Sequence, residues 1–266
     1  MVRRGIAASR SEATDAIRSG KVTVAGRPAA KSSMLVLPEE PIAMARSAGR
    51  FVSRGGEKLD AALDRFGVHV SGRTALDAGA STGGFTDCLV SREAAHVIAI
   101  DVGYGQLDWR LREDARVTVL ERTNARDLQP EALPNVPDLV TADLSFISLR
   151  LVLPALVRCS TPDAEFVLLV KPQFEAGRSE ADGGGGVVRD AEVWLRVLQS
   201  VAAAGEDVGL DIDGVMPSPL LGPAGNVEFF LHARRRMGEE GEAKPSMQSA
   251  IDRAVEEAKG LAVRHD

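Results

Sequence analysis

Several kinds of residue are scarce in this chain of 266 residues, and each scarcity excludes certain classes of protein or kinds of site. Its two cysteines, Cys88 and Cys159, stand alone and form no metal-ligand spacing. They fit a reduced cytosolic protein better than a disulfide-stapled secreted domain. The four histidines are scattered along the chain, so we expect no zinc site and no other metal centre.

Long apolar runs are also missing. No stretch reaches the roughly 18 apolar residues that predict a transmembrane helix. Residues 1–5 lead into a polar segment rather than the apolar core of a signal peptide. We therefore expect a cytoplasmic protein without a membrane partner. With 44% hydrophobic and 26% charged residues, the chain has room for one large domain, or for a large and a small one.

The charge is unevenly distributed along the chain. Residues 1–31 carry seven basic and two acidic side chains, a local charge of +5, whereas the net charge of the whole chain is −6. A basic module on an acidic body favours a nucleic-acid partner. Charge alone fits a solvated basic surface equally well.

A glycine-rich stretch organises the larger part of the chain. Residues 74–76 are expected to form a buried strand, which ends at Asp77 and runs into a turn over residues 79–84. The helix that follows would present free N–H groups and a partial positive charge to a ligand. A second strand, 96–100, ends at Asp101, 24 residues after Asp77. That spacing is close to the roughly 20 residues between a nucleotide loop and its ribose-binding carboxylate, so we expect a nucleoside-cofactor site.

The spacing of the glycines indicates which cofactor. The pattern Gly79-x-x-x-Gly83-Gly84 lacks the dinucleotide fingerprint G-x-G-x-x-G. It resembles the glycine motif of methyltransferases that use S-adenosylmethionine, with Ser81 in place of one glycine. Asp77 then suits the cationic amino-acid end of that cofactor, Asp101 its ribose diol and Asn124 its adenine edge. The predicted cofactor-binding residues are Asp77, Gly79, Ser81, Thr82, Gly83, Gly84, Phe85, Asp101, Asn124 and Asp143.

Strands and helices alternate from residue 74 onward. We expect strands at 74–77, 96–101, 117–120, 139–142 and 166–170, and helices near 84–91, 108–113, 147–158 and 191–203. This alternation predicts a parallel α/β sheet covered by helices. Segments 210–215 and 227–231 have no helix between them, so we expect them to be antiparallel, and 246–259 to form a covering helix. The predicted fold is the Rossmann-like, seven-stranded methyltransferase sheet.

Residues 1–43 have the pattern of a small α+β module. Ser9 and Glu12 form a capping box for a helix to Arg18, and strand 22–24 enters an Ala25–Gly26 turn. The pattern resembles the RNA-binding S4 domain, lacking the first residues of that family. The resemblance implies contacts to the RNA backbone by the basic residues Arg3, Arg4, Arg10, Arg18, Lys21 and Lys31. Residues 44–53 are expected to form a linker to a cofactor domain at 54–266.

Polar residues follow every predicted strand, and the carboxyl ends of parallel strands share one edge. Among them and in the segment before the sheet stand Lys58, Asp143, Lys171 and Glu228. This set resembles that of the FtsJ-type ribose 2′-O-methyltransferases. Alone, Lys58 near the start of a helix is more often a surface lysine.

The strings that carry the further resemblance are residues 53–59, 77–86, 121–126, 142–148 and 170–175. With the S4 pattern they resemble the TlyA family over nearly the whole chain. The resemblance implies 2′-O-methylation of cytidines in ribosomal RNA, with ribosomal subunits as partners. The chain departs from it at its short N-terminus and at Phe51, where relatives often have tryptophan.

The expected reaction is in-line attack of a ribose 2′-hydroxyl on the sulfonium methyl. A free hydroxyl is a poor nucleophile, so a base or a strong orienting group is needed. Lys171 is the candidate base, because positive charge from Lys58 and the sulfonium favours its neutral form. Asp143 and Glu228 oppose this effect, or instead orient the lysines so that proximity supplies much of the rate.

Three other functions fit parts of the sequence. One is an RNA-binding or ribosome-assembly factor with an inactive methyltransferase fold, which the intact Lys-Asp-Lys-Glu set disfavours. A membrane-active protein is the second, because relatives carry the label haemolysin; the lack of an apolar span disfavours it. The third is a small-molecule O-methyltransferase, which the basic N-terminal module disfavours.

Overall fold

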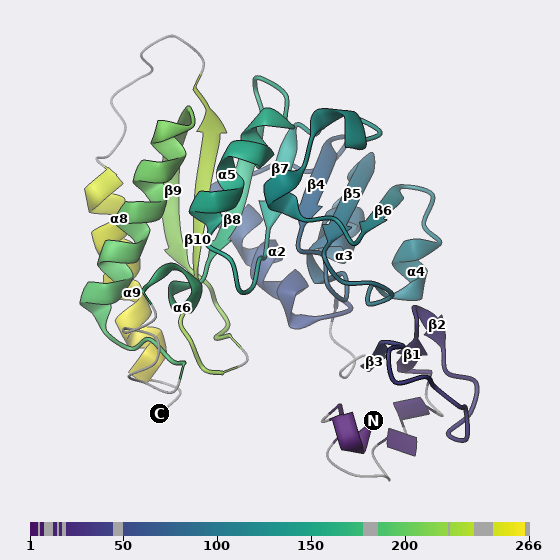
Figure 1. Cartoon of the computed structure of the whole chain (residues 1–266). Helices are drawn as coiled ribbons and strands as arrows, with labels where there is room; N and C mark the ends of the chain where they lie inside the picture. Colours follow the sequence, from purple (N-terminus) through teal and green to yellow (C-terminus); the bar gives the residue numbers. More distant parts are fainter. Residues whose placement is uncertain are drawn as a thin grey trace.

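The structure is a computed structural model, and it describes residues 1–4, 6–7, 13–14, 16–17, 20–44, 50–177, 186–222, 224–236 and 247–263. Within these ranges the chain forms a three-stranded sheet near the N-terminus and a seven-stranded sheet with helices on both faces (Figure 1). The predicted fold class, an α/β sheet preceded by a small N-terminal module, is therefore confirmed.

The N-terminal part is small and has little core. Its elements are η1 (Val2–Arg4), β1 (Val22–Val24), β2 (Arg27–Pro28) and β3 (Ile42–Met44), with β1 antiparallel to both other strands. Ala25 and Gly26 form the predicted turn with φ of 49° and 77°, as a tight hairpin requires. Most of the helix predicted over residues 9–18, Arg10 and Arg18 included, lies outside the described residues.

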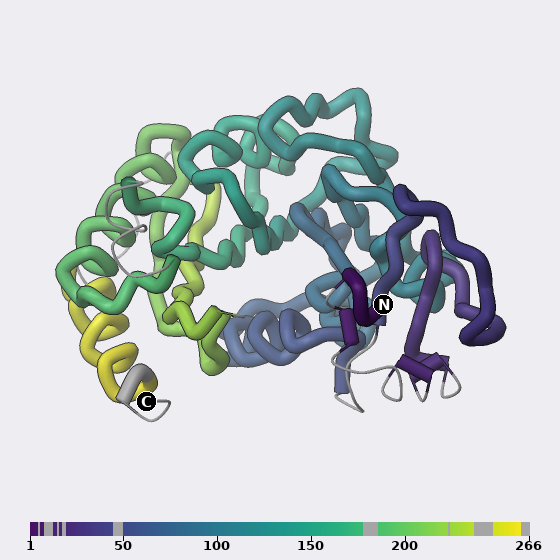
Figure 2. Tube along the Cα trace, turned by 60° about the horizontal axis from the view of Figure 1, so that its bottom comes forward, coloured from purple at the N-terminus to yellow at the C-terminus, as the bar shows by residue number. Residues whose placement is uncertain are grey.

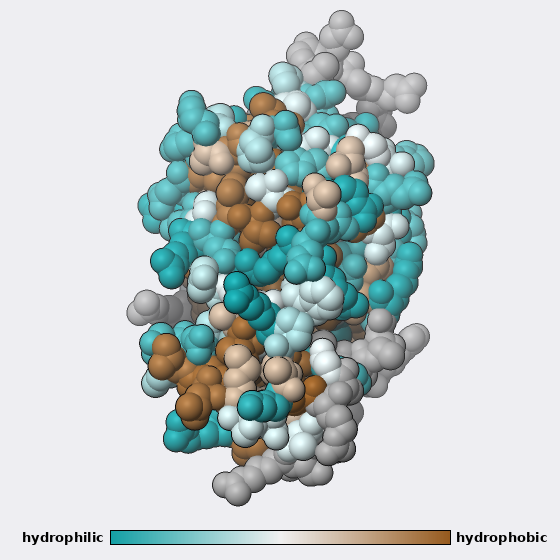
Figure 3. All heavy atoms as spheres, turned by 90° about the vertical axis from the view of Figure 1, so that its right-hand side faces the viewer, coloured by the Kyte–Doolittle hydropathy of each residue, from teal (hydrophilic) through white to brown (hydrophobic). Residues whose placement is uncertain are grey.

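Several apolar side chains of this part stay outside its core. Met34 and Leu37 are exposed, and Leu35 is 96% exposed. Figure 3 views the side on which the small sheet and β6 lie, and shows apolar residues in separate patches on a mostly hydrophilic surface. A core built around Ala16, Val22, Val24 and Ala29 is too small to cover more.

The large sheet has the predicted topology, with strand order β6-β5-β4-β7-β8-β10-β9. Only β10 runs antiparallel to its neighbours β8 and β9, which confirms the expected antiparallel pair at the end of the chain. The strands are β4 (Thr74–Ala78), β5 (His96–Asp101), β6 (Val117–Glu121), β7 (Leu139–Ala142), β8 (Glu165–Val170), β9 (Leu210–Pro217) and β10 (Phe229–Arg235).

Helices cover both faces of this sheet. They are α2 (Arg54–Phe66), α3 (Gly84–Ser91), α4 (Trp109–Arg112), α5 (Leu149–Arg158), α6 (Pro172–Glu175), α8 (Ala191–Asp207) and α9 (Met247–Val263), with the 3₁₀ turns η2 (Ala125–Asp127) and η3 (Pro130–Ala132). In Figure 1, α2 and α3 lie behind the sheet and α5 and α8 in front of it. Two buried clusters, one on each face, form the core and exclude water from the sheet.

The small sheet lies at the carboxyl ends of the parallel strands. Its β1–β2 turn contacts the segment after β5: a Cβ placed on Gly105 would be 3.1 Å from Cα of Ala25. Figure 2, in which the bottom of Figure 1 comes forward, shows the purple N-terminal segment beside this edge of the sheet. The edge where functional groups of such sheets gather therefore faces the N-terminal module.

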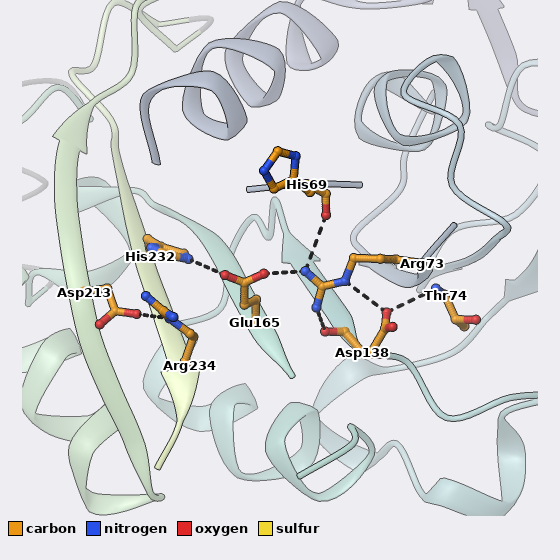
Figure 4. A network of polar contacts seen from close by, with 8 residues as sticks. All are labelled: His69, Arg73, Thr74, Asp138, Glu165, Asp213, His232 and Arg234. Atoms are coloured by element: carbon orange, nitrogen blue, oxygen red, sulfur yellow. Dashed lines mark hydrogen bonds and ion pairs between the residues drawn. The ribbon is translucent and has the colours of Figure 1, made fainter. Parts of the chain in front are cut away.

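The opposite, amino edge of the sheet is closed by a polar network (Figure 4). Arg73, just before β4, forms ion pairs with Asp138 and Glu165, and His232 Nε2 lies 3.3 Å from Glu165 Oε1. Asp138 Oδ1 also accepts a hydrogen bond from the backbone N–H of Thr74 at 3.1 Å. The hydrogen bond from His232 and the charge of Arg73 lower the pKa of Glu165 to about 2. Charged residues at or just before the starts of β4, β7 and β8 are thereby paired at the base of the sheet.

Candidate active site

The glycine-rich loop follows β4 and is tied to β5 by its backbone. The N–H groups of Gly79 and Ala80 donate to the carbonyl oxygen of Ile100 at 2.9 and 3.1 Å. Asp101 continues this connection, because its carboxylate accepts from Ser81 N at 2.8 Å and from Gly103 N at 2.6 Å. One carboxylate thus fixes the loops after both strands.

The glycines of this loop allow close packing as well as unusual backbone angles. A Cβ on Gly79 would lie 2.5 Å from the carbonyl oxygen of Asp143, and one on Gly84 would lie 2.1 Å from Ser53 Oγ. Gly83 has a φ of 100° and caps α3. Ser81, which stands where the motif usually has glycine, has a φ of 48°, in the left-handed region that glycine favours.

Asp77 is fully buried beneath the loop. Its Oδ2 accepts a 2.6 Å hydrogen bond from Thr86 Oγ1, while Oδ1 has no hydrogen-bond partner among the residues that the structure describes. Burial, with smaller contributions from Asp143 and Asp101, raises the pKa of Asp77 to about 7. The site therefore holds a carboxyl group whose ionised form is poorly compensated by the protein alone.

The Lys-Asp-Lys-Glu residues are brought together as two ion pairs. Lys58 Nζ lies 2.6 Å from Glu228 Oε2, and both side chains are buried. Lys171 Nζ lies 2.5 Å from Asp143 Oδ1 and donates to Ser145 Oγ at 3.1 Å. Lys58 comes from the second turn of α2 and Glu228 from the residue before β10. Segments 170 residues apart in the chain thus meet at one point of the sheet edge.

One cavity of about 1510 Å³ joins these features. Its wall includes the glycine-rich loop, all four residues of the two ion pairs and part of the small N-terminal sheet. Among its lining residues are Lys21, Thr23, Met44, Arg54, Lys58, Gly79, Ser81, Thr82, Gly84, Phe85, Trp109, Asp143, Ser145, Lys171 and Glu228. Many of the residues predicted to form a site at the carboxyl edge of the sheet therefore border a single space.

Comparison with known families agrees with this geometry. The family model described as FtsJ-like methyltransferase matches residues 51–235, and the S4 domain model matches residues 1–42. The chain belongs to the FtsJ-like methyltransferase family. Its predicted membership of the TlyA group is confirmed by the relatives.

Two curated relatives illustrate the names that occur in this family. The 16S/23S rRNA (cytidine-2′-O)-methyltransferase TlyA of Mycobacterium tuberculosis is 51% identical over 97% of this chain and 96% of its own length. Hemolysin A of Brachyspira hyodysenteriae is 37% identical over 86% of this chain and 95% of its own length. A solved structure from Streptococcus thermophilus, described as a hemolysin, has a TM-score of 0.74 at 36% identity and covers 95% of this chain and 92% of that one.

Nothing described in this FtsJ-like chain resembles a membrane span or a metal centre. None of the described helices has the length and apolar character to cross a bilayer. Likewise, the described histidine, cysteine, aspartate and glutamate side chains form no group of three that could hold a metal ion.

Some predicted site residues lie away from the cavity. Asn124 is exposed and caps η2 by accepting from Arg126 N, so it is engaged in local structure at the end of β6. Arg4 donates to the carbonyl oxygens of Leu37, Pro38 and Glu40 and thereby holds a loop of its own module. Arg3 and Lys31 are exposed, and of the described basic residues predicted to bind RNA, only Lys21 lines the cavity.

The sequence prediction missed several residues that line or support the site. Ser145 contacts Lys171, and Arg54 and Trp109 form part of the cavity wall. Glu175 lies at the end of the Lys171 turn and is buried against the start of α5. Ser145 and Glu175 were visible as polar residues after predicted strands, but their partners depend on how two loops meet in space.

Proposed function

We propose that this FtsJ-like protein transfers a methyl group from S-adenosylmethionine to the 2′-hydroxyl of a cytidine ribose in ribosomal RNA, acting on ribosomal subunits in the cytoplasm. The observation that carries the proposal is the single cavity that contains both the glycine-rich loop and the pairs Lys58–Glu228 and Lys171–Asp143. The curated relative that is 51% identical carries an activity of this type in its name.

The residues of the loop fit S-adenosylmethionine. Asp77 does not line the cavity, but its buried Oδ1 lacks a partner among the described residues, and we propose that its charge compensates a cationic ligand from beneath the loop. Gly79, Ser81, Thr82, Gly84 and Phe85 all line the cavity, and Asp101 at the end of β5 holds Ser81 in place. We assign the cofactor to these residues; when bound, it supplies an electrophilic methyl group on a sulfonium.

We propose that Lys171 acts on the ribose hydroxyl. Asp143 and Ser145 fix its Nζ at the cavity wall, and we propose that Nζ orients the 2′-hydroxyl and, in its uncharged amine form, takes up the hydroxyl proton. Lys58 is held by Glu228, so its charge is matched by a carboxylate at the other side of the same site. Orientation by two fixed ion pairs reduces the entropy that the reaction would otherwise have to lose.

The N-terminal module would bind the RNA that delivers this ribose. Residues 1–31 carry a local charge of +5, and Lys21 is among the residues that line the cavity. Basic side chains hold RNA chiefly through its phosphates, so the module adds affinity and orientation without reading a sequence. This combination favours a polynucleotide over a small-molecule substrate.

The test is methyl transfer from labelled S-adenosylmethionine to separated ribosomal subunits and to naked ribosomal RNA. We expect label on a ribose 2′-oxygen, lost in Lys171→Ala and retained in Lys259→Ala, an exposed lysine of α9 paired with Glu256. Cofactor binding without transfer to any ribosomal RNA, in subunits or free, would contradict the proposal and favour a binding factor with an inactive methyltransferase fold.

A further inference from the structure

The segment that carries Asp143 follows β7, and the segment that carries Lys171 follows β8. The two segments separate where these strands stop pairing. The last backbone partners of β7 and β8 are Ala142 and Leu168. Beyond them, residues 143–148 turn toward α5 and residues 171–175 form α6. The backbone N–H of Asp143 still donates to the carbonyl oxygen of Ala78 at 2.9 Å, but among the described residues no backbone hydrogen bond joins residues 144–148 to residues 171–175.

Side chains connect these segments at successive points. The innermost contacts join Lys171 to Asp143 and Ser145, and farther out the rings of Phe146 and Phe174 lie 5.1 Å apart. Phe146 is 91% exposed, and the contacts of Lys171 face the cavity. The side chains of Lys171 and Asp143 are 11% and 24% exposed, so these inner contacts are less shielded from water than a fully buried interaction.

The outermost connection is different because it is buried. Glu175 Oε1 accepts from Leu149 N at 2.6 Å, and its Oε2 accepts from Ser148 Oγ at 2.5 Å. Arg150 Nε lies 3.4 Å from Oε2, and the side chain of Glu175 is 3% exposed. The carboxylate also sits at the N-terminus of α5, where the helix dipole favours negative charge.

From these contacts we propose that Glu175 is a positioning residue for methyl transfer. It fastens the turn that follows Lys171 to the start of α5, and so sets the distance between Lys171 and the loop that carries Asp143. We call the contacts of the Glu175 carboxylate with Ser148, Leu149 and Arg150 the brace. The kinetic test of this inference rests on the proposed function, but the effect of the brace on the loop can be measured without a substrate.

The loop that Glu175 fastens is strained. Phe146 has a φ of 64°, a conformation that a bulky residue adopts only where the surrounding structure enforces it. Two side-chain bonds and an ion pair at the end of the loop supply such enforcement. Without them residues 144–148 can relax, and Ser145 and the side chain of Asp143, whose backbone N–H is held by Ala78, would move relative to Lys171.

A general loss of stability is the competing explanation, and β8 provides a matched control. Glu165 begins this strand at the amino edge, pairs with Arg73 and His232, and has a side chain that is 21% exposed. Glu175 follows the same strand at the carboxyl edge. Removing either carboxylate should reduce stability. Of these two residues, however, only Glu175 connects the segment after β8 to the segment after β7.

The experiment compares Glu175→Ala, Glu175→Gln and Glu165→Ala in the full-length chain, below the melting temperature of each variant. We expect Glu175→Ala to lower kcat about 10- to 100-fold, because misplacement by about 1 Å can have such an effect. KM for RNA and the Kd for cofactor should stay within about threefold. Glu175→Gln keeps an acceptor for Leu149 N and should recover kcat to within about fivefold. Glu165→Ala should keep kcat within about twofold.

Hydrogen exchange gives a readout that does not depend on the substrate. Glu175→Ala should speed exchange over residues 143–149, and Glu165→Ala should not. An inactive wild-type protein with this exchange pattern would contradict the proposed function and leave the brace standing. A kcat for Glu175→Ala within twofold of wild type, or an equal loss in Glu165→Ala, would overturn the proposal.

If Glu175→Ala does not fold, Ser148→Ala removes one of the two hydrogen bonds and leaves the carboxylate bonded to Leu149 N. The expected result is a three- to tenfold lower kcat with faster exchange over residues 143–149, since one bond of the brace remains. Unchanged kcat and unchanged exchange over residues 143–149 in Ser148→Ala would likewise overturn the proposal.

Discussion

The two edges of the large sheet carry similar side chains in different arrangements. At the amino edge, Arg73, Asp138, Glu165 and His232 contact one another directly, and together they close the base of the strands. At the carboxyl edge, the ion pairs Lys58–Glu228 and Lys171–Asp143 border a cavity of about 1510 Å³. Paired charges alone therefore do not mark a site; the space beside them does.

The titration of one acid on each edge shows the same contrast. Hydrogen bonds and charge lower the pKa of Glu165 to about 2, whereas burial raises the pKa of Asp77 to about 7. A lowered carboxyl pKa means that the fold stabilises the ionised form, and a raised one means that it does not. Asp77 is thus the acid whose charge lacks compensation within the protein.

The largest expected effect is on catalysis at the carboxyl edge. Lys171→Ala should lower methyl transfer by about 10³-fold or more, because it removes the group that acts on the hydroxyl. Cofactor binding, measured by calorimetry, should stay nearly unchanged, since the glycine-rich loop is intact. Normal turnover in this variant would show that Lys171 does not act on the hydroxyl. The Lys171–Asp143 pair would then have no more catalytic role than the ion pairs at the amino edge.

A second large effect concerns the buried pair. Glu228→Gln leaves the Lys58 ammonium buried without its carboxylate, so we expect the free energy of unfolding to fall by about 3–5 kcal/mol. The double variant Lys58→Met/Glu228→Gln should lose less than the sum of the single changes. Urea unfolding of Lys58→Met, Glu228→Gln and the double variant measures these losses of stability. Additive losses would show that the two residues do not interact.

A smaller effect, with a definite sign, is expected for Asp77→Asn. Because the folded pKa of Asp77 is raised from 3.8 to about 7, the wild-type protein loses stability as pH rises through this range and levels off above it. The variant cannot ionise, so its stability relative to wild type should increase by about 1–3 kcal/mol between pH 4 and pH 8. Unfolding of the cofactor-free proteins at several pH values tests this, and a difference that does not vary with pH would contradict it.

The smallest and opposite effect is expected for Glu165→Gln. The folded pKa of Glu165 is lowered from 4.5 to about 2, so its contribution is present above about pH 4.5 and is lost as pH falls toward 2. At pH 7 the variant should be less stable by about 1–2 kcal/mol, a modest value because these side chains are only partly buried. Thermal unfolding at pH 7 and pH 3 should show the gap narrowing on acidification; a gap that widens would reverse the assignment.

The alternation of apolar segments and turns was sufficient to predict the sheet. Strands β5 and β7 begin and end where the sequence predicts, since buried parallel strands are short apolar runs with clear limits. The predicted strand 227–231 begins later, at Phe229, and this difference leaves Glu228 in the loop, where it meets Lys58. Helix α5 begins at Leu149 rather than near residue 147, because Ser148 caps it.

Local pattern and residue type were enough to predict the fold and the glycine-rich loop, and resemblance to a known family identified the four ion-pair residues. Long-range contacts in the folded chain set how these residues pair, bury Asp77 beneath the loop, and join Glu175 to the start of α5. These features arise from contacts between residues far apart in the chain, and side-chain packing at the sheet edge sets them after the strands have paired.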